Sequence, residues 1–382
     1  MAERKCINLI FRYSDNWTGG TYYILNIIKS LKLLDDAQQP AIQVLHDKDS
    51  PIQAIKDINY PYLSFKVVKL HVSLFEKAVN KFFYLLNGYR PFMVKLPSDI
   101  KANVYPLFTD IMDSNMRNAY YWIPDFQEHY YPEFFDKYEI RARTSMYDDV
   151  LKRNSNIVFS SMNALEDYNR FFPSNRNTKK VLNFASFIND SYKTINATAL
   201  LNKFGITKPF FIVPNQFWKH KNHKTVLAAS ALLKELCSDF QIVFTGKEFD
   251  YRYPDYAEQL KSYVKENNLN NMLFLGFIDR EEQLKLMAES VAIIQPSLFE
   301  GWSTVVEDSK VVNQKIIISD IPLHREQIKE NCIFFDPLNP ADLADKIKDT
   351  LKSTTIAEAI DYQAVQRKFA DDFIHLFDEK TV

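Results

Sequence analysis

Residues 296–307 read PSLFEGWSTVVE, and this stretch decides most about the fold of the chain. It follows a continuous apolar run at 291–294 and leads into a segment with a helical pattern. Its polar groups therefore fall at the carboxyl end of a predicted parallel strand, the edge at which open α/β sheets bind ligands. Two carboxylates, a glycine and a pair of hydroxyl residues offer acceptors for sugar hydroxyls and backbone donors for phosphate. The chemistry indicated is the binding of a nucleotide sugar.

Short apolar runs of the same kind recur through the second half of the chain, with helical patterns between them. They lie at 210–213, 241–244, 272–275, 291–294, 315–318 and 332–335. Continuous apolar character is typical of strands that are buried on both faces, and the helices supply right-handed crossovers. We expect a doubly wound parallel sheet.

The first half of the chain repeats this pattern less regularly. Candidate strands lie at 7–11, 41–45, 65–70, 119–123, 157–160 and 180–182. A polar loop that ends in Gly19 and Gly20 follows the first of them, and apolar residues at helical spacing continue over 24–34. Residues 183–208 lose strand character and predict a linker. The fold class predicted is α/β, with two Rossmann-like doubly wound parallel-sheet domains that face each other across a cleft.

Length and composition narrow the class of protein. A chain of 382 residues fits two domains, and a net charge of −1 gives no overall field for nucleic acid. Cys6, Cys237 and Cys332 lie in or beside apolar runs without metal or redox spacing, which predicts small core residues in a reducing compartment. No apolar stretch approaches 18 residues. We therefore expect a soluble, cytoplasmic protein with no nucleic-acid partner.

Glycine is scarce, so its positions carry information. The chain has seven glycines, against an average near 7% of residues. Gly246, Gly276 and Gly301 each follow an apolar run, where the backbone must turn tightly or approach a ligand. We include Gly246, and Phe277 beside Gly276, in the candidate nucleotide site.

The two glutamates of the opening stretch have different candidate roles. Glu300 is predicted to accept hydroxyls of the donor sugar and to stabilise positive charge at the anomeric carbon; the alternative is an inert loop residue. Glu307 either holds the two ribose hydroxyls of a nucleotide or closes a capping box with Thr304. Ser303 and Thr304 are expected to present free amides to phosphate oxygens at the helix start.

A basic run, WKHKNHK at 218–224, follows the strand at 210–213. Lysine supplies a point charge that neutralises a leaving diphosphate without a metal, so Lys221 is a catalytic candidate. The alternative is a solvated entry to the next helix. In the first half, Asp125 and His129 follow a strand and are candidates for holding an acceptor hydroxyl, or else a simple cap or surface residues.

These motifs together resemble the retaining glycosyltransferases of family 4, the group 1 glycosyltransferases, which have the GT-B fold. The resemblance is carried by the Glu-Gly-aromatic…Glu turn after Pro-Ser, the lysine turn and Gly19-Gly20. It implies an acceptor-binding domain at 1–186, a nucleotide-sugar-binding domain at 187–360 and a C-terminal helix at 361–382 that packs back toward the first domain. It also implies that no divalent metal is required.

The same resemblance assigns roles to individual residues. Glu300 matches the glutamate that touches the donor sugar, and Glu307 matches the glutamate on the ribose. Lys221 matches the lysine on the diphosphate, and Gly20 matches the phosphate-facing glycine turn. Glu300 and Glu307 enclose six residues where the family usually has seven.

A family arginine that precedes the diphosphate lysine is replaced by Gln216. Glutamine can donate a hydrogen bond to phosphate but brings no charge. Lys219, Lys247 and Arg12 are the candidates for compensating this loss, and the alternative is a weaker stabilisation of the leaving group.

The predicted function is that of a metal-independent, retaining glycosyltransferase. It moves a hexose-type sugar from a GDP- or UDP-linked donor to a hydroxyl of a glycan or lipid-linked glycan, with no other cofactor. The resemblance implies cell-surface polysaccharide synthesis and allows peripheral association with the inner face of the membrane. It leaves the oligomeric state open.

Three rival functions are weighed against this prediction. The alternative retained is a non-catalytic two-lobed sugar- or nucleotide-binding module. A metal-dependent transferase would use the Asp-x-Asp pair at 47–49. A dinucleotide oxidoreductase is disfavoured, because no Gly-x-Gly-x-x-Gly follows a strand.

Overall fold

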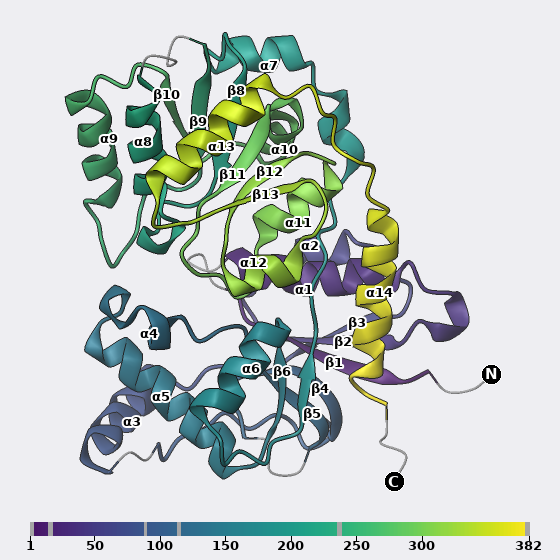
Figure 1. Ribbon diagram of the computed structural model, residues 1–382. Helices are drawn as coiled ribbons and strands as arrows, with labels where there is room; N and C mark the ends of the chain where they lie inside the picture. Colours follow the sequence, from purple (N-terminus) through teal and green to yellow (C-terminus); the bar gives the residue numbers. More distant parts are fainter. Residues whose placement is uncertain (1–3, 14–17, 88–89, 113–115, 235–238, 379–382) are drawn as a thin grey trace. The chain divides into compact units, whose positions relative to one another are not determined.

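The chain forms two compact units. The computed structural model describes residues 4–13, 18–87, 90–112, 116–234 and 239–378 (Figure 1). The first unit holds Met1–Phe126, Lys137–Phe187 and Gln363–Val382. The second unit holds Gln127–Asp136 and Ile188–Tyr362.

The first unit is built on a seven-stranded parallel sheet in the order β3-β2-β1-β4-β5-β6-β7. Its strands are β1 Cys6–Phe11, β2 Ala41–His46, β3 Leu63–Val67, β4 Ala102–Leu107, β5 Arg117–Ile123, β6 Asn156–Phe159 and β7 Lys179–Val181. Its helices include α1 Thr18–Leu31, η1 Asp36–Gln38, α2 Gln53–Lys56, α3 Leu74–Asn87, α5 Lys137–Lys152, α6 Met162–Phe171 and, near the C-terminal end of the chain, α14 Tyr362–His375.

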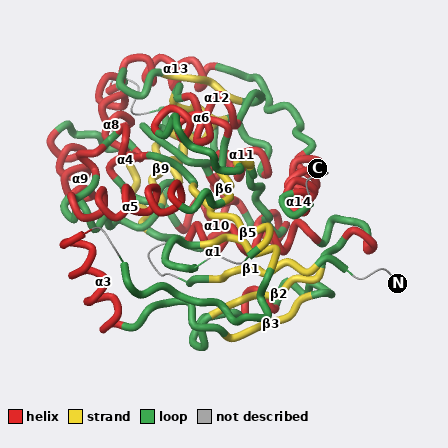
Figure 2. The backbone as a smooth tube through the Cα atoms, turned by 90° about the horizontal axis from the view of Figure 1, so that it is seen from below, coloured by secondary structure: helices red, strands yellow, loops and turns green. Residues whose placement is uncertain are grey.

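Helices cover both faces of this first sheet, as the red and yellow segments of Figure 2 show. Neighbouring residues of β4 point to opposite faces, because side chains alternate along a strand. Val104 packs in the cluster to which α5 and α6 contribute. Tyr105 instead lies against Tyr23 of α1 and Phe373 of α14.

The second unit is built on a six-stranded parallel sheet in the order β10-β9-β8-β11-β12-β13. Its strands are β8 Phe210–Pro214, β9 Gln241–Thr245, β10 Met272–Gly276, β11 Ala292–Gln295, β12 Ile316–Ser319 and β13 Cys332–Phe335. Its helices include α4 Gln127–Tyr130, η2 Pro132–Phe134, η3 Asp190–Thr194, α7 Ala197–Lys203, η4 Lys219–Lys221, α8 His223–Leu232, α9 Tyr256–Glu266, α10 Arg280–Glu289, α11 Thr304–Val311, α12 Pro322–Gln327 and α13 Pro340–Lys352.

The apolar runs in the four inner strands of the second sheet are buried on both faces, as expected, whereas those in the end strands β10 and β13 are mostly half-buried. Every residue of β8, β9, β11 and β12 is buried. Phe211 packs in a core to which α8, α9 and α13 contribute, and its neighbour Ile212 packs in a core with α7, α10 and α11 (Figure 1). The predicted fold class, two Rossmann-like doubly wound sheets, is confirmed.

One strand, β4, was not predicted from the sequence. β4 lies between β1 and β5, yet it contains Pro106, and a proline usually argues against an inner strand because it has no N–H to donate. The pairing of β4 with β5 is irregular between Val104 and Leu107, which is where the sheet accommodates the proline.

The segment expected to be a linker, 183–208, is largely part of the second unit. It contains η3 and α7, whose residues Tyr192 and Leu200 are buried against Leu284 and Met287 of α10. The residues around Tyr192 and Leu200 in the sequence are mostly small or polar, so the apolar pattern was not recognised there.

Two further expectations concern the burial of the cysteines and the presence of membrane-spanning helices. Cys6 is exposed and Cys332 is partly exposed, so the prediction of buried thiols was wrong for both, because each is the first residue of its strand; Cys237 lies outside the described residues. Within the described ranges, no helix has the length and apolar character needed to cross a membrane.

Candidate functional site

The candidate site begins where the strand order of the second sheet reverses, between β8 and β11. Such a switch point is where doubly wound sheets bind ligands, at the carboxyl ends of the strands. Asn215 follows β8 directly, and Gln295 ends β11. The side-chain nitrogen Nδ2 of Asn215 donates a hydrogen bond of 2.8 Å to Gln295 Oε1, and both side chains are buried.

Glu300 and Lys221 form an ion pair beside these amides. Lys221 Nζ lies 2.6 Å from Glu300 Oε1, and the side chains are 19% and 8% exposed. Gln295 Nε2 donates to the same carboxylate oxygen at 2.9 Å. The two residues are 79 positions apart in the sequence, so the fold brings together two predicted catalytic candidates.

The carboxylate of Glu300 is held in its charged form. Burial by itself raises its pKa, but the ammonium of Lys221 outweighs this effect, and the pKa lies below the ordinary value. The hydroxyl of Ser297 adds a further hydrogen bond in the same direction. The site therefore presents a buried negative charge at neutral pH.

Two loops are tied together to hold this pair. The Leu298 amide donates to the His220 carbonyl at 2.8 Å, and Asn222 Nδ2 donates to the Pro296 carbonyl at 3.1 Å. Asn222 takes a left-handed backbone conformation, φ 56°, between η4 and α8. Burial, aided by the nearby Lys221 charge, lowers the pKa of His220 to about 3, so this neighbour is neutral.

Glu307 does not close the capping box with Thr304 that was the alternative to ribose binding. Helix α11 begins at Thr304, and Ser303 is its cap, with a hydroxyl that accepts from the Val306 amide at 3.4 Å. The Glu307 side chain is 1% exposed. Its Oε1 accepts from Lys310 at 2.8 Å and Gln327 at 2.9 Å, and its Oε2 accepts from the Tyr362 hydroxyl at 2.6 Å.

The amide expected to be free at Ser303 is occupied within the protein. It donates to Gln327 Oε1 at 3.0 Å, while Gln327 Nε2 donates back to the Ser303 carbonyl at 2.8 Å. Thr304, the next residue, is exposed at the first position of α11. Of the two predicted phosphate amides, Thr304 is therefore the one at the surface.

Gly246 has a backbone reason to be glycine. Its φ is +134°, and a Cβ there would lie 2.3 Å from the Asn215 carbonyl oxygen. Only glycine lets the loop after β9 approach the loop after β8 this closely. Gln216 lies half-buried in the latter loop, and Phe277, after β10, has its ring 82% exposed.

The residues proposed to replace the charge of the missing arginine contact aromatic rings or a carboxylate of the protein. Lys219 Nζ lies 4.0 Å from the centre of the Tyr253 ring, and Lys247 Nζ lies 6.0 Å from that of Phe249. Arg12 belongs to the first unit, where Nη1 forms a 2.7 Å ion pair with Asp110.

His324 is a site residue that sequence reading missed. It is completely buried, and Nδ1 lies 2.9 Å from the Ser319 carbonyl, so the neutral ring carries its proton there. Within the described part of the chain, Nε2 has no hydrogen-bond partner. Burial lowers the pKa of His324 to about 4, although the nearby Glu300 opposes this. His324 follows the apolar run of β12 in the segment SDIPLHREQ at 319–327. This position after a strand is the sequence signal that could have identified it.

In the first unit, Gly19 and Gly20 lie in the first turn of α1. Gly20 lines a small cavity of about 10 Å³, together with Arg12, Phe108 and Trp122. Arg12 follows β1 and Phe108 follows β4, so this cavity lies at the strand-order reversal of the first sheet. Asp125 follows β5, with Oδ1 4.0 Å from Arg143 Nη1.

His129 belongs to the second unit although it comes from the first half of the chain. It is exposed on α4, and Nε2 lies 3.9 Å from Glu128 Oε1. The next residue, Tyr130, packs its ring 5.3 Å from that of Phe299, and the Tyr131 hydroxyl donates to the Leu298 carbonyl at 3.4 Å. The segment 127–136 is thus attached to the loop that carries Glu300.

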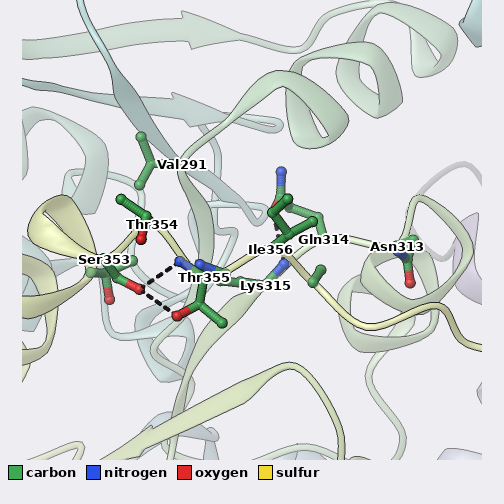
Figure 3. Close-up of a pocket in the computed structure, with 10 residues that line it drawn as sticks. Val291, Asn313, Gln314, Lys315, Ser353, Thr354, Thr355 and Ile356 are labelled. Atoms are coloured by element: carbon green, nitrogen blue, oxygen red, sulfur yellow. Dashed lines mark hydrogen bonds between the residues drawn. The ribbon is translucent and has the colours of Figure 1, made fainter.

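A larger cavity lies at the opposite edge of the second sheet. It measures about 340 Å³ and is lined by Val291, Gln314, Lys315 and the segment 353–357, which follows α13 (Figure 3). Val291 and Lys315 come just before β11 and β12, whereas Glu300 follows β11. The cavity therefore contains none of the predicted site residues.

Asp47, the first residue of the rival Asp-x-Asp metal site, is bound by groups of the protein. Asp47 Oδ1 accepts from the Leu70 amide at 2.9 Å, and Oδ2 lies 3.4 Å from His71 Nε2. Among the described residues, no group of three or more His, Cys, Asp and Glu is arranged to hold a metal ion.

Comparison with known proteins gives the same family for the unit that carries this site. Residues 199–367 match the family described as glycosyl transferases group 1. The chain is 29% identical over 157 residues to the serotype-specific mannosyltransferase WbdA of Escherichia coli, which is 41% of this chain and 19% of that protein. It is 24% identical over 226 residues to the O-antigen chain mannosyltransferase RfbU of Salmonella typhimurium, 58% of each chain. The matches thus span about a fifth and somewhat over half of these relatives.

The whole chain shares its fold with solved structures. A glycosyltransferase from Rickettsia africae superposes with a TM-score of 0.61 over 98% of this chain and 94% of its own, at 14% identity. HepE from Anabaena, solved with UDP and glucose, superposes with a TM-score of 0.67 over 98% of this chain and 97% of its own, at 15% identity. Residues 199–367 thus match the group 1 glycosyltransferases, and the likeness over both units shows that the chain has the GT-B fold.

Proposed function

We propose that this protein is a retaining, metal-independent glycosyltransferase of family 4. It transfers a hexose-type sugar from a GDP- or UDP-linked donor to a hydroxyl of a glycan or lipid-linked glycan. The observation that carries the proposal is the buried pair of Lys221 and Glu300 at the switch point of the second sheet.

The pair provides both charges that the reaction needs. The Lys221 ammonium has three N–H donors, and its hydrogen bond to Glu300 uses one of them. The others are available to oxygens of the leaving diphosphate. As the bond between the anomeric carbon and the phosphate oxygen breaks, Lys221 stabilises the departing charge and Glu300 stabilises the cationic carbon. The backbone amide of Thr304, an exposed residue at the start of α11, is proposed to add a donor for phosphate.

Glu307 is proposed to accept hydroxyls of the donor ribose. A carboxylate has about four acceptor positions, and protein donors occupy three of them here. A clamp on both ribose hydroxyls therefore requires one protein donor to leave. Lys310, 11% exposed, is the charged candidate for leaving. Gly246, Gln216 and the exposed Phe277 complete the proposed nucleotide site of the second unit. Gly19 and Gly20 stay a proposed phosphate-facing turn of the first unit.

His129 and Asp125 are proposed to position the acceptor hydroxyl. The attachment of the 127–136 segment to the loop of Glu300 supports His129, because Tyr130 packs on Phe299 next to the carboxylate. The relatives named as mannosyltransferases support a hexose, with cell-surface polysaccharide as the product. Such a protein acts in the cytoplasm, on acceptors presented at the inner face of the membrane.

The role of Lys221 is tested by comparing ligands that differ only in the diphosphate. We expect Lys221→Gln to weaken binding of UDP or GDP by about 10- to 100-fold, because a charge-assisted hydrogen bond is lost. Binding of the matching nucleoside, measured by the same calorimetry, should be unchanged. Lys224 is an exposed lysine in the first turn of α8, three positions after Lys221, so Lys224→Gln is the matched control and should bind both ligands normally.

Several outcomes contradict the proposal. Equal loss of nucleoside and diphosphate affinity would place Lys221 outside the phosphate contact. Tight binding of free sugar with no nucleotide binding would favour the non-catalytic module. Activity that is abolished by EDTA would argue for a metal-dependent transferase. The anomeric configuration of the product, determined by NMR, tests retention directly.

A further inference from the structure

Helix α3 presents its apolar side chains to solvent instead of to the core. At about 100° per residue, Leu74, Phe75, Phe82, Leu85 and Leu86 fall within an arc of roughly 120°. The exposed fractions of these five residues are 84%, 73%, 59%, 57% and 67% in that order. We call this surface the α3 face. Single exposed apolar residues are ordinary, but five on one arc of a 14-residue helix need an explanation.

The opposite side of α3 is the one that the protein holds. Asn80 Nδ2 donates to the Phe92 carbonyl at 2.8 Å, and the Phe92 amide donates back to Asn80 Oδ1 at 2.9 Å. The Tyr84 hydroxyl donates to the Arg141 carbonyl at 3.1 Å. Because polar side chains fix the inner side, the exposure of the α3 face is a feature of the folded unit.

Positive charge borders the α3 face. Lys77 and Lys81, both exposed, lie along one edge of the arc. Arg90 and Lys95 follow in the sequence, and residues 77–98 contain no Asp or Glu. An apolar helical face with lysines along its border is the pattern of helices that lie in the interface of a bilayer with anionic lipids.

We propose that the α3 face docks on a membrane surface that contains anionic lipid, with α3 lying in the plane of the interface. A helix of 14 residues is about 21 Å long, too short for a hydrocarbon core of about 30 Å, so α3 lies on the bilayer. The alternative occupant is a second copy of this chain. It is disfavoured because it would bring the same lysines against one another, whereas anionic headgroups neutralise them. This inference does not depend on the chemistry at Glu300.

The test is co-sedimentation of the full chain with vesicles. One set contains phosphatidylcholine alone, and the other contains phosphatidylcholine with phosphatidylglycerol. We expect binding to the anionic vesicles that is at least tenfold stronger than binding to the neutral ones. Lys77→Glu with Lys81→Glu should reduce anionic-vesicle binding by at least about 20-fold, since each basic residue near the surface contributes about fivefold.

The apolar contribution is tested with Phe75→Ser and Phe82→Ser combined, which should reduce binding by at least tenfold. The matched controls are Leu232→Ser for the apolar change and Lys265→Glu with Lys352→Glu for the charge change. These control residues are exposed and lie on other helices. Nucleotide binding, measured in parallel, should be the same in all variants.

The proposal is overturned if the unchanged protein ignores anionic vesicles, or if the Phe75 and Phe82 changes leave vesicle binding intact. It is also overturned if light scattering shows a dimer that these changes dissociate, because a second copy would then cover the α3 face. Loss of vesicle binding with normal nucleotide affinity supports it.

Discussion

His324 illustrates how burial fixes the charge of one side chain. Its ring is fully buried at the candidate site, and the Ser319 carbonyl accepts its Nδ1 proton. Burial lowers its pKa to about 4, so the ring is neutral wherever the protein is folded near neutral pH. In the unfolded chain the same ring takes up a proton near pH 6.5.

This difference predicts a pH dependence of stability. Between about pH 6.5 and pH 4 the unfolded state binds a proton that the folded state does not, so the free energy of unfolding falls as the pH falls. The loss from His324 amounts to about 3 kcal/mol at the lower limit. His324→Asn keeps an N–H near the Ser319 carbonyl and removes the titration. Urea unfolding at several pH values should therefore give a shallower decline for the variant, and an identical decline would contradict this account.

At the scale of elements, the loops that follow the strands are fixed by backbone geometry as much as by side chains. Gly246 and Gly205 both have positive φ, +134° and +67°. They differ in their surroundings, because a Cβ at Gly246 would overlap the Asn215 carbonyl, whereas at Gly205 nothing lies within 4 Å. Substitutions at these two positions therefore distinguish the cost of an unfavourable φ from the cost of steric overlap.

We predict that Gly246→Ala destabilises the second unit by about 3 kcal/mol or more, because it adds overlap with backbone to an unfavourable φ. Gly205→Ala should cost about 1 kcal/mol, since only the left-handed conformation is penalised. Chemical denaturation of both variants measures the difference. Equal losses would show that the loop after β9 relaxes away from Asn215.

At the scale of the whole molecule, each unit has buried clusters of its own. Among the residues that the structure describes, one cluster lies wholly in the first unit, and two lie wholly in the second, one on each face of its sheet. The chain nevertheless ends in the first unit, because α14 packs Phe373 against Tyr105 at a ring distance of 6.1 Å. Residues from both ends of the chain therefore stabilise one sheet.

This division predicts two calorimetric transitions. Phe373→Ala removes a fully buried ring, so it should destabilise the first unit by about 3–5 kcal/mol and lower the midpoint of one transition. UDP or GDP at 100 times its dissociation constant should add about 2.7 kcal/mol to the second unit and raise the other midpoint. A nucleotide that raises the same transition that Phe373→Ala lowers would contradict the assignment.

Periodicity in the sequence was sufficient for most of the fold. Strands buried on both faces read as continuous apolar runs, so β8, β9, β11 and β12 were visible. β4 was not, because Pro106 interrupts its pattern, and α7 was hidden in a polar segment. The α3 face was not visible either, since a helical pattern in the sequence does not say which side faces the core.

The sequence by itself determined that two parallel sheets form and that Glu300, Lys221 and Glu307 follow their strands at the ligand-binding edge. It determined this because local hydrophobic patterns and strand-to-helix turns are properties of neighbouring residues. Tertiary structure alone decided that Lys221 pairs with Glu300, that Tyr362 reaches Glu307 and that His324 is buried beside them. Those contacts join residues that are far apart in the chain, and only the packing of the elements brings them within hydrogen-bonding or electrostatic range.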